Sequence, residues 1–261
     1  MKASIPFLCL MLAMLSACLP YDLTKMQPAQ IETLYSGSLE DAVYPTRNKV
    51  DENLFAINKQ NKALNWKTIN GEEYVLMVSW KGNDKYYKAP YVKEDGIYPT
   101  GSKYPIWVTA APQLATWAKG EPRFMKWVKN GEKAKVDGRL KQLLGLPPNP
   151  NYTYNYFIEF WVKPDDLFRP CPDAEIADNE CDANFPPNID STYQAWINNT
   201  RAARFYDPSK LLDKYPWTAL GYTYDWSPRN KTHQGLSEYV IKNDKNVIVN
   251  AIYTTEEYLK K

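Results

Sequence analysis

The segment that most constrains the fold is residues 152–162, because its apolar side chains alternate over the length of a β-strand. A second segment, residues 73–80, carries apolar side chains on both of its faces, which is typical of a strand buried on both sides. Together the two segments predict a sheet with a buried centre. The side chains expected on one face of the first segment are Tyr154, Tyr156, Ile158, Phe160 and Val162.

The rest of the chain mixes further strands with helices and shows no repeated strand–helix unit. This order predicts an α+β fold, with a single domain, a mainly antiparallel sheet and flanking helices. Turn residues Asn243, Asp244 and Lys245 separate the last two strands, so we expect a C-terminal β-hairpin there. The additional strands are expected at residues 85–92, 104–110, 220–226, 236–241 and 246–253. The helices are expected at residues 29–35, 112–118, 124–128, 136–144 and 191–205.

The amino-terminal residues have the layout of a secretory signal peptide, in which Lys2 precedes an apolar run and small residues lead to a cysteine. The apolar run is too short to span a bilayer as a helix. A resemblance to the lipobox of bacterial lipoproteins is carried by Leu15-Ser16-Ala17-Cys18. That resemblance implies cleavage before Cys18 and acylation of this residue. An ordinary signal peptide with a chance cysteine is the alternative.

A lipid on Cys18 would make the membrane a partner of this chain, and several acyl chains would anchor it firmly. Because residue 19 is Leu rather than Asp, the resemblance implies the outer membrane where the host has two membranes. The expected organisation is a signal peptide at residues 1–17, a polar tether at 18–42 and a single α+β envelope domain at 43–261.

Four cysteines are present. Cys9 would leave with the signal peptide and Cys18 would carry lipid, so Cys171 and Cys181 remain as an isolated pair. An oxidising envelope favours a disulfide between them. A metal site is the rival interpretation, but no histidine lies nearby and there is no second cysteine pair, so we expect no metal.

Charge and motif content exclude several function classes. The formal net charge is only +2, which gives no electrostatic reason to expect nucleic acid as a partner. The single histidine, His233, excludes multi-histidine metal sites. Neither a phosphate-binding P-loop nor a glycine-rich dinucleotide motif is present, and we expect no bound cofactor.

Aromatic residues are abundant, with nine Trp, twenty Tyr and eight Phe, and they are dense in residues 215–226. An exposed aromatic row there would stack on sugar rings or on a peptide, whereas a buried row would be core. Candidate partners for an exposed row are an envelope protein, peptidoglycan or another glycan. The candidate binding residues are Tyr215, Trp217, Tyr222, Tyr224 and Trp226.

Asp225 and Glu238 are the candidate catalytic carboxylates. A pair of carboxylates at a suitable separation can act as general acid and base on a glycosidic bond, although solvated single carboxylates are the simpler interpretation. Ser237 with His233 is a weaker candidate for a nucleophile and its base.

Two short segments, residues 107–115 (Trp-Val-Thr-Ala-Ala-Pro-Gln-Leu-Ala) and residues 237–241 (Ser-Glu-Tyr-Val-Ile), carry a resemblance to ADP-ribosyltransferases. The first segment resembles the strand and helix that carry a Ser-Thr-Ser motif in that family, and the second resembles the place of its catalytic glutamate. The resemblance implies that Thr109 supports a pocket and that Glu238 polarises the ribose of NAD. The sequence departs from the family in having Thr-Ala-Ala for Ser-Thr-Ser. Residues 73–80 also lack the expected early Arg or His.

Residues 157–241 resemble uncharacterised bacterial envelope proteins, and this resemblance implies no activity. Its residues are 159–172, 215–218 and 221–226. The sequence therefore predicts a membrane-anchored lipoprotein with a non-enzymatic binding or organising role in the envelope. The alternative is an enzyme that uses Glu238, either ADP-ribosyltransferase-like or glycan-hydrolysing.

Overall fold

The computed structural model describes residues 22–205 and 212–261, with the side chains of residues 204 and 205 left out. The signal peptide, Cys18 and Leu19 lie outside the described residues, so the lipobox stays a prediction. Among the helices that are described, none has both the length and the apolar character needed to cross a membrane.

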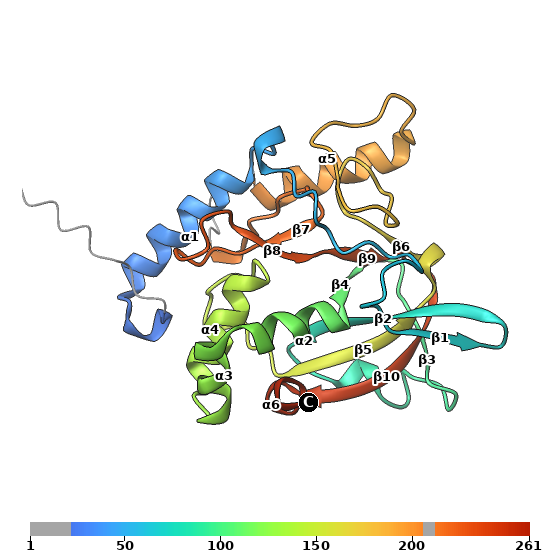
Figure 1. Ribbon diagram of the computed structural model, residues 1–261, viewed down its shortest axis with the longest axis horizontal. Coiled ribbons are helices and arrows are strands. Elements are labelled where there is room, and N and C mark those ends of the chain that lie inside the picture. Colours follow the sequence, from blue (N-terminus) through green and yellow to red (C-terminus); the bar gives the residue numbers. More distant parts are fainter. Residues whose placement is uncertain (1–21, 206–211) are drawn as a thin grey trace, which may run out of the picture.

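One sheet of eight strands forms the body of the domain, and a two-stranded hairpin lies beside it (Figure 1). The strands of the large sheet are β1 (Trp66–Ile69), β2 (Glu72–Lys81), β3 (Ile97–Pro99), β4 (Ile106–Ala110), β5 (Tyr156–Val162), β6 (Leu167–Phe168), β9 (Tyr239–Ile241) and β10 (Asn246–Thr254). The hairpin consists of β7 (Tyr222–Tyr224) and β8 (Gln234–Ser237). The sheet order is β3-β10-β5-β2-β4-β9-β6, β1 pairs with the first part of β2, and the pairings between these strands are antiparallel.

Several helices pack against one face of the sheet. The α-helices are α1 (Pro28–Ala42), α2 (Ala111–Gly120), α3 (Pro122–Lys129), α4 (Lys133–Leu143), α5 (Ser191–Phe205) and α6 (Thr255–Lys260). The short 3-10 helices are η1 (Leu23–Lys25), η2 (Arg47–Lys49), η3 (Lys85–Tyr87) and η4 (Pro164–Asp166). Helices α1, α2 and α3 each have a proline at their first or second position. The N–H groups at these positions make no intrahelical hydrogen bond, so proline costs nothing there.

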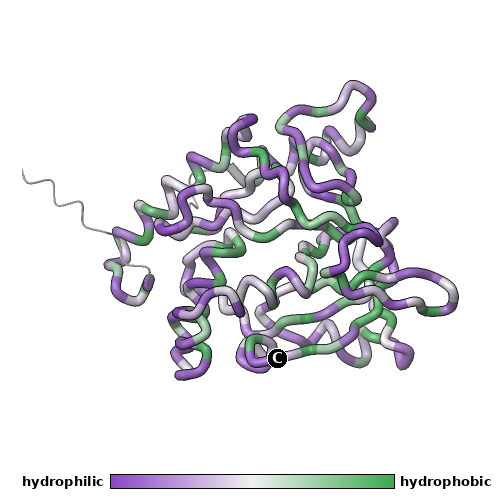
Figure 2. The backbone as a smooth tube through the Cα atoms, in the orientation of Figure 1, coloured by the Kyte–Doolittle hydropathy of each residue, from purple (hydrophilic) through white to green (hydrophobic). Residues whose placement is uncertain are grey.

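Strand β2 is the centre of the core because it is buried on both faces, as its apolar pattern predicts. Leu76, Val78 and Trp80 pack with residues of α2, α3, α4 and α6. Val75 and Met77 pack on the opposite face with residues of β4, β5 and β9. Fully burying one such side chain stabilises the fold by about 1.5–3 kcal/mol. Hydrophobic residues accordingly gather along the strands, and the outlying loops are mostly hydrophilic (Figure 2).

The expected α+β class is confirmed, since helices flank a mainly antiparallel sheet in one domain. The expected C-terminal β-hairpin is wrong. The turn itself forms, with Asp244 at a φ of 56°, but both edges of β9 are occupied by β4 and β6. Strand β10 therefore passes to the other half of the sheet and pairs with β3 and β5.

Two further local expectations differ from the structure. Residues 85–92 form η3 and a loop rather than a strand, and Pro90 offers no N–H to a ladder. The helix expected at residues 29–35 is longer and packs on the body through Tyr35, whose ring meets that of Trp226 at 5.3 Å between centroids. Residues 28–42 therefore belong to the domain rather than to a tether.

The expected disulfide is confirmed between Cys171 and Cys181. It cross-links the long irregular segment between β6 and α5. In the same segment Arg169 is fully buried and donates to the carbonyl oxygens of Asp178 and Glu180 at 2.7 and 2.5 Å. The covalent link and this buried guanidinium together order a loop that has little regular structure of its own.

Candidate functional site

The candidate site is a cavity of about 270 Å³ between the sheet and the β7–β8 hairpin. One wall consists of the second half of β2 and the end of β4. The opposite wall consists of β7, residues 215–217 and the turn at residues 144–146 that follows α4. The cavity is therefore formed where the hairpin stands beside the centre of the sheet.

Gly145 allows the two parts of that second wall to approach each other. Its φ is +62°, and a Cβ added there would lie only 3.3 Å from the carbonyl oxygen of Tyr224. A residue with a side chain would be strained in this left-handed conformation and crowded against β7. The sequence expectation that the helix ends at Gly145 is thus met, with a packing reason for the glycine.

Thr109 and Glu238 both line this cavity. Thr109 lies on β4, and Glu238 directly precedes the neighbouring strand β9, where Tyr239 pairs with Val108. In an antiparallel ladder the next residues in register are Thr109 and Glu238, and residues in this relation project to the same face of a sheet. The structure therefore brings together the two residues that the ADP-ribosyltransferase resemblance singles out.

Gln113 connects Thr109 to the residue before Glu238. The Thr109 hydroxyl donates to Oε1 of Gln113 at 3.3 Å, and the backbone N–H of Ser237 donates to the same oxygen at 3.1 Å. The Gln113 side-chain amide donates in turn to Oγ of Ser237 at 3.3 Å. This network ties the start of α2 to the strand junction that presents Glu238.

Aromatic side chains supply much of the rest of the cavity wall. Trp80 stacks on Tyr154 with ring centroids 4.9 Å apart, and Trp107 meets Trp217 edge to face at 5.9 Å. The Nε1 atom of Trp217 is buried and has no hydrogen-bond partner among the described residues. A buried indole N–H usually has an acceptor, so this atom suits an acceptor group on a ligand.

Lys81 ends β2 and supplies the cationic side chain among the described residues that line the cavity. Burial lowers the pKa of the Lys81 ammonium from its usual 10.5 to about 8, because the charged form loses hydration there. At neutral pH the group is still protonated and gives the cavity, which Glu238 also lines, a positive charge.

The expected aromatic row lies in the interior rather than on an exposed face. Tyr222 and Tyr224 are buried yet line the cavity, as do Tyr215 and Trp217. Trp226 is fully buried elsewhere, in a cluster with Tyr35 of α1. Its Nε1 donates to two backbone carbonyl oxygens at 3.1 Å each. Four of the five candidate binding residues therefore share one site, and Trp226 is a core residue.

Asp225 lies in a different cavity from Glu238. Arg139 donates from both of its terminal nitrogens to the two carboxylate oxygens of Asp225, at 2.9 and 2.8 Å. The Asn230 amide and the Ser227 N–H donate to the same carboxylate at 3.0 Å each. The structure does not bring the two candidate carboxylates together, and Asp225 is a buried ion-pair partner.

His233 and Ser237 are likewise directed to other groups. Nδ1 of His233 lies 2.8 Å from the carbonyl oxygen of Asp225, and the ring stacks on Tyr224 at 4.8 Å. Oγ of Ser237 accepts from the N–H of Phe55 at 2.7 Å. These contacts do not join the two side chains as a nucleophile and its base.

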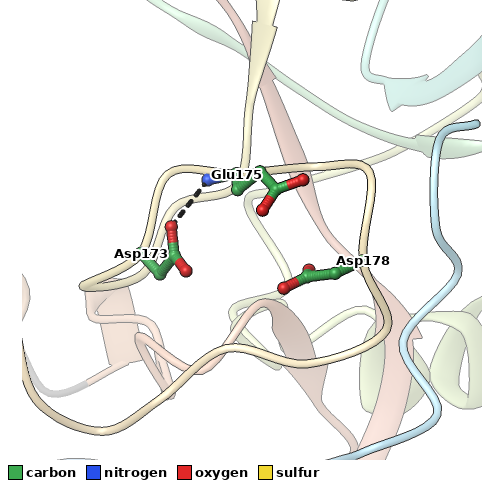
Figure 3. A group of neighbouring side chains, drawn as sticks. All are labelled: Asp173, Glu175 and Asp178. Carbon is green, nitrogen blue, oxygen red and sulfur yellow. Dashed lines mark hydrogen bonds between the residues drawn. The ribbon is translucent and has the colours of Figure 1, made fainter. Parts of the chain in front are cut away.

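A group of three carboxylates lies on the disulfide-stapled loop (Figure 3). The candidate ligand atoms of Asp173, Glu175 and Asp178 lie within 4.8 Å of one another. Arg169 already ion-pairs with Asp178 at 2.5 Å, and Asp173 accepts from the N–H of Glu175 at 3.0 Å. Arg169 thus neutralises one of the three carboxylates, exposed acidic groups are common without an ion, and we assign no ion to this group.

Sequence reasoning missed Gln113, Lys81 and Arg139. The spacing of Thr109 and Gln113 across a strand–helix junction is a signal that could have suggested the first of them. The other two depend on contacts between distant segments and leave no local pattern.

Comparison of the chain with protein-family models, with curated proteins and with solved structures finds no match. The functional argument therefore rests on the cavity itself.

Proposed function

We propose that this chain is a lipoprotein of the bacterial envelope, anchored through Cys18, whose cavity binds NAD and cleaves it at Glu238 in the manner of ADP-ribosyltransferases. The observation that carries the proposal is the register of β4 and β9, which presents Thr109 and Glu238 to one cavity. These are the two positions that the resemblance identifies, and they come from segments far apart in the sequence.

The chemistry of the cavity fits such a substrate. Loss of nicotinamide from NAD breaks the bond between ribose C1 and the ring nitrogen, and positive charge develops on the ribose. A carboxylate held beside that carbon stabilises the charge most effectively in a site that excludes water. Glu238 is half-buried, and its Oε2 is shielded from solvent. Nicotinamide leaves as a neutral molecule with the electron pair of the broken bond, and water or an acceptor group adds to C1 and releases a proton to solvent.

Other cavity residues suit a planar ring and a phosphate group of NAD. The aromatic wall around Trp107 and Trp217 suits a planar ring. Lys81 offers its positive charge to a phosphate. Thr109 acts through Gln113 as a positioning residue for the strand junction at Glu238.

A second candidate function is binding without turnover, in a non-enzymatic organising role in the envelope. The observation that favours it is that the two residues after Thr109 carry no hydroxyl group, unlike those of the Ser-Thr-Ser motif. Both of them, Ala110 and Ala111, are buried. Under this candidate the same aromatic cavity holds a ligand, such as a peptidoglycan or other glycan fragment, and Glu238 contributes a hydrogen bond rather than catalysis.

The test is to incubate the purified full-length protein with NAD and to measure free nicotinamide by chromatography, with Glu238→Gln as the control. Release by the wild-type protein and not by the variant is the expected result. Saturable NAD binding in both proteins without release favours the second candidate. A folded protein that neither binds NAD nor releases nicotinamide overturns the assignment of NAD to this cavity.

The anchor is tested separately by replacing Cys18 with Ser and fractionating cells. We expect the wild-type chain in the membrane fraction and the variant in the soluble fraction. A variant that still sediments with membranes contradicts the lipobox. Separating the inner from the outer membrane then tests the location that Leu19 implies.

A further inference from the structure

We propose that the exposed basic face formed by α3 and its neighbouring residues docks on anionic lipid headgroups of the membrane that holds Cys18. This inference rests on the proposed anchor and adds an orientation to it. The unit consists of α3, the start of α4, the end of α2 and η1, and we call it the basic face. Its exposed lysines are Lys25, Lys119, Lys126, Lys129 and Lys133.

The basic face is a concentration of charge in a nearly neutral chain. Residues 119–135 contain six Lys or Arg and two Glu, whereas the whole protein has a formal net charge of +2. One of the two acids, Glu132, is ion-paired with Lys135. A local excess of positive charge attracts an anionic membrane surface, and each basic residue near that surface contributes a similar increment.

The amphipathic character of α3 fixes which way its charges point. Phe124, Trp127 and Val128 are buried in the core, which holds this helix against the body. Lys126 and Lys129 are three residues apart and exposed, and residues at that spacing share a helix face. The fold therefore presents the cations outward as a fixed surface.

The described chain begins beside this surface. Asp22 ion-pairs with Lys135 at 3.7 Å, and Leu23 lies against Gly138 of α4, where an added Cβ would be 3.3 Å from Leu23. Asp22 is four positions after Cys18, so covalent geometry limits the distance between their Cα atoms to about 14 Å. A lipid on Cys18 thus keeps the membrane surface close to this end of the molecule.

This arrangement leaves the cavity open to the envelope. Its lining residues belong to the sheet, the β7–β8 hairpin and the segments that adjoin them, and none of those described belongs to α3. Strands β1 and β3 lie at the opposite end of the molecule from α3 (Figure 1). Docking through the basic face would therefore point β1 and β3 away from the membrane.

The test is lysine footprinting of the full-length protein reconstituted in vesicles. Native lysines are acetylated briefly and quantified by mass spectrometry, with phosphatidylcholine vesicles compared with vesicles rich in phosphatidylglycerol. We expect acetylation of Lys126, Lys129 and Lys133 to fall about fivefold on the anionic vesicles and to recover in high salt. Exposed lysines at the far end are the internal control, and their labelling should not change: Lys67, Lys93 and Lys103.

A matched pair of variants sharpens the test. Lys126→Gln, Lys129→Gln and Lys133→Gln together should abolish the protection of Lys25 on anionic vesicles. The same replacement at Lys67, Lys93 and Lys103 should preserve it. Equal labelling on both kinds of vesicle, or protection of the far-end lysines instead, overturns the inference. The mass of the Cys18 peptide, read in the same experiment, distinguishes a missing anchor from a wrong docking face.

Discussion

Asp225 and Glu238 each follow directly after a strand of the same hairpin, yet the structure gives them different surroundings. Strands β7 and β8 are antiparallel, so the residue after β7 lies at the turn end and the residue after β8 lies at the open end. Asp225 is held by Arg139 inside the protein, whereas Glu238 borders an aromatic cavity. Similar positions in a local sequence pattern therefore carry different roles, because strand direction decides where each residue lies.

The strongest test of this difference in role between Asp225 and Glu238 is to measure nicotinamide release in two isosteric variants. Glu238→Gln removes the carboxylate charge from the proposed NAD site, and we expect nicotinamide release to fall about 10²–10³-fold. Asp225→Asn keeps the shape of a group outside that cavity, so its rate should stay closer to that of the wild-type protein. Equal losses in two folded variants, checked by circular dichroism, would contradict the separation of roles.

Stability should show the reverse order. Asp225→Ala leaves the guanidinium of Arg139 buried without its carboxylate partner, and removal of one member of a buried ion pair costs about 3–5 kcal/mol of unfolding free energy. Chemical denaturation measures this value, and Glu238→Gln should lower it less. A loss below about 1 kcal/mol for Asp225→Ala would mean that water enters this site and replaces the lost carboxylate.

The disulfide-linked loop can likewise be compared with the cavity, because the loop does not line it and loss of the disulfide should change stability but not turnover. Replacing Cys171 and Cys181 together with Ser removes the link across their ten-residue separation, and we expect a loss of about 2–3 kcal/mol. Nicotinamide release by the fraction that remains folded should be unchanged. Reduction of the wild-type protein with dithiothreitol is the matching control, because it breaks the same bond without a mutation.

The smallest expected effect concerns pH. Because burial lowers the pKa of Lys81 to about 8, the positive charge of the cavity is present below that pH and is lost as the pH rises through it. Affinity for NAD should therefore weaken a few-fold between neutral pH and pH about 9. Isothermal calorimetry of the wild-type protein and of Lys81→Met measures this change. A wild-type affinity that is flat over this range would show that Lys81 makes no contact with the phosphates.

The same proton affects folding with the opposite pH trend. Between about 8 and the usual 10.5, the unfolded chain binds more protons at Lys81 than the folded chain does. The contribution of this residue to the free energy of unfolding therefore rises with pH across that window. Comparison with Lys81→Met separates this contribution from that of the other titrating groups.

The sequence predicted the parts of the fold that a local pattern encodes. Alternation located β2, β5 and β10 to within a few residues, and the isolation of Cys171 and Cys181 as the last remaining cysteine pair indicated their disulfide. It did not predict pairing across long separations, so the strand after the turn at Asp244 was assigned to the wrong neighbour. Hairpins are inferred from a turn between two strands, and nothing in the turn records whether a strand edge is already occupied.

The site was partly predictable for the same reason. Glu238 and Thr109 could be found by resemblance, and the dense aromatic segment indicated four residues that line the cavity. The pairing of Asp225 with Arg139 could not be found, because the two residues are 86 positions apart and meet only through tertiary packing. An Asp between two strong strand formers looks the same in sequence whether it is ion-paired or exposed.

The cavity is built and supported by residues that lie far apart along the chain, so it cannot form until the late segments are present. Gln113 meets Ser237 across 124 residues, and α1 reaches the backbone of Lys214 across 179. In the exported chain that we propose, these late segments would be the last to cross the membrane. The cavity would then form only after the carboxyl-terminal strands are delivered, which would confine any ligand capture to the compartment in which folding is completed.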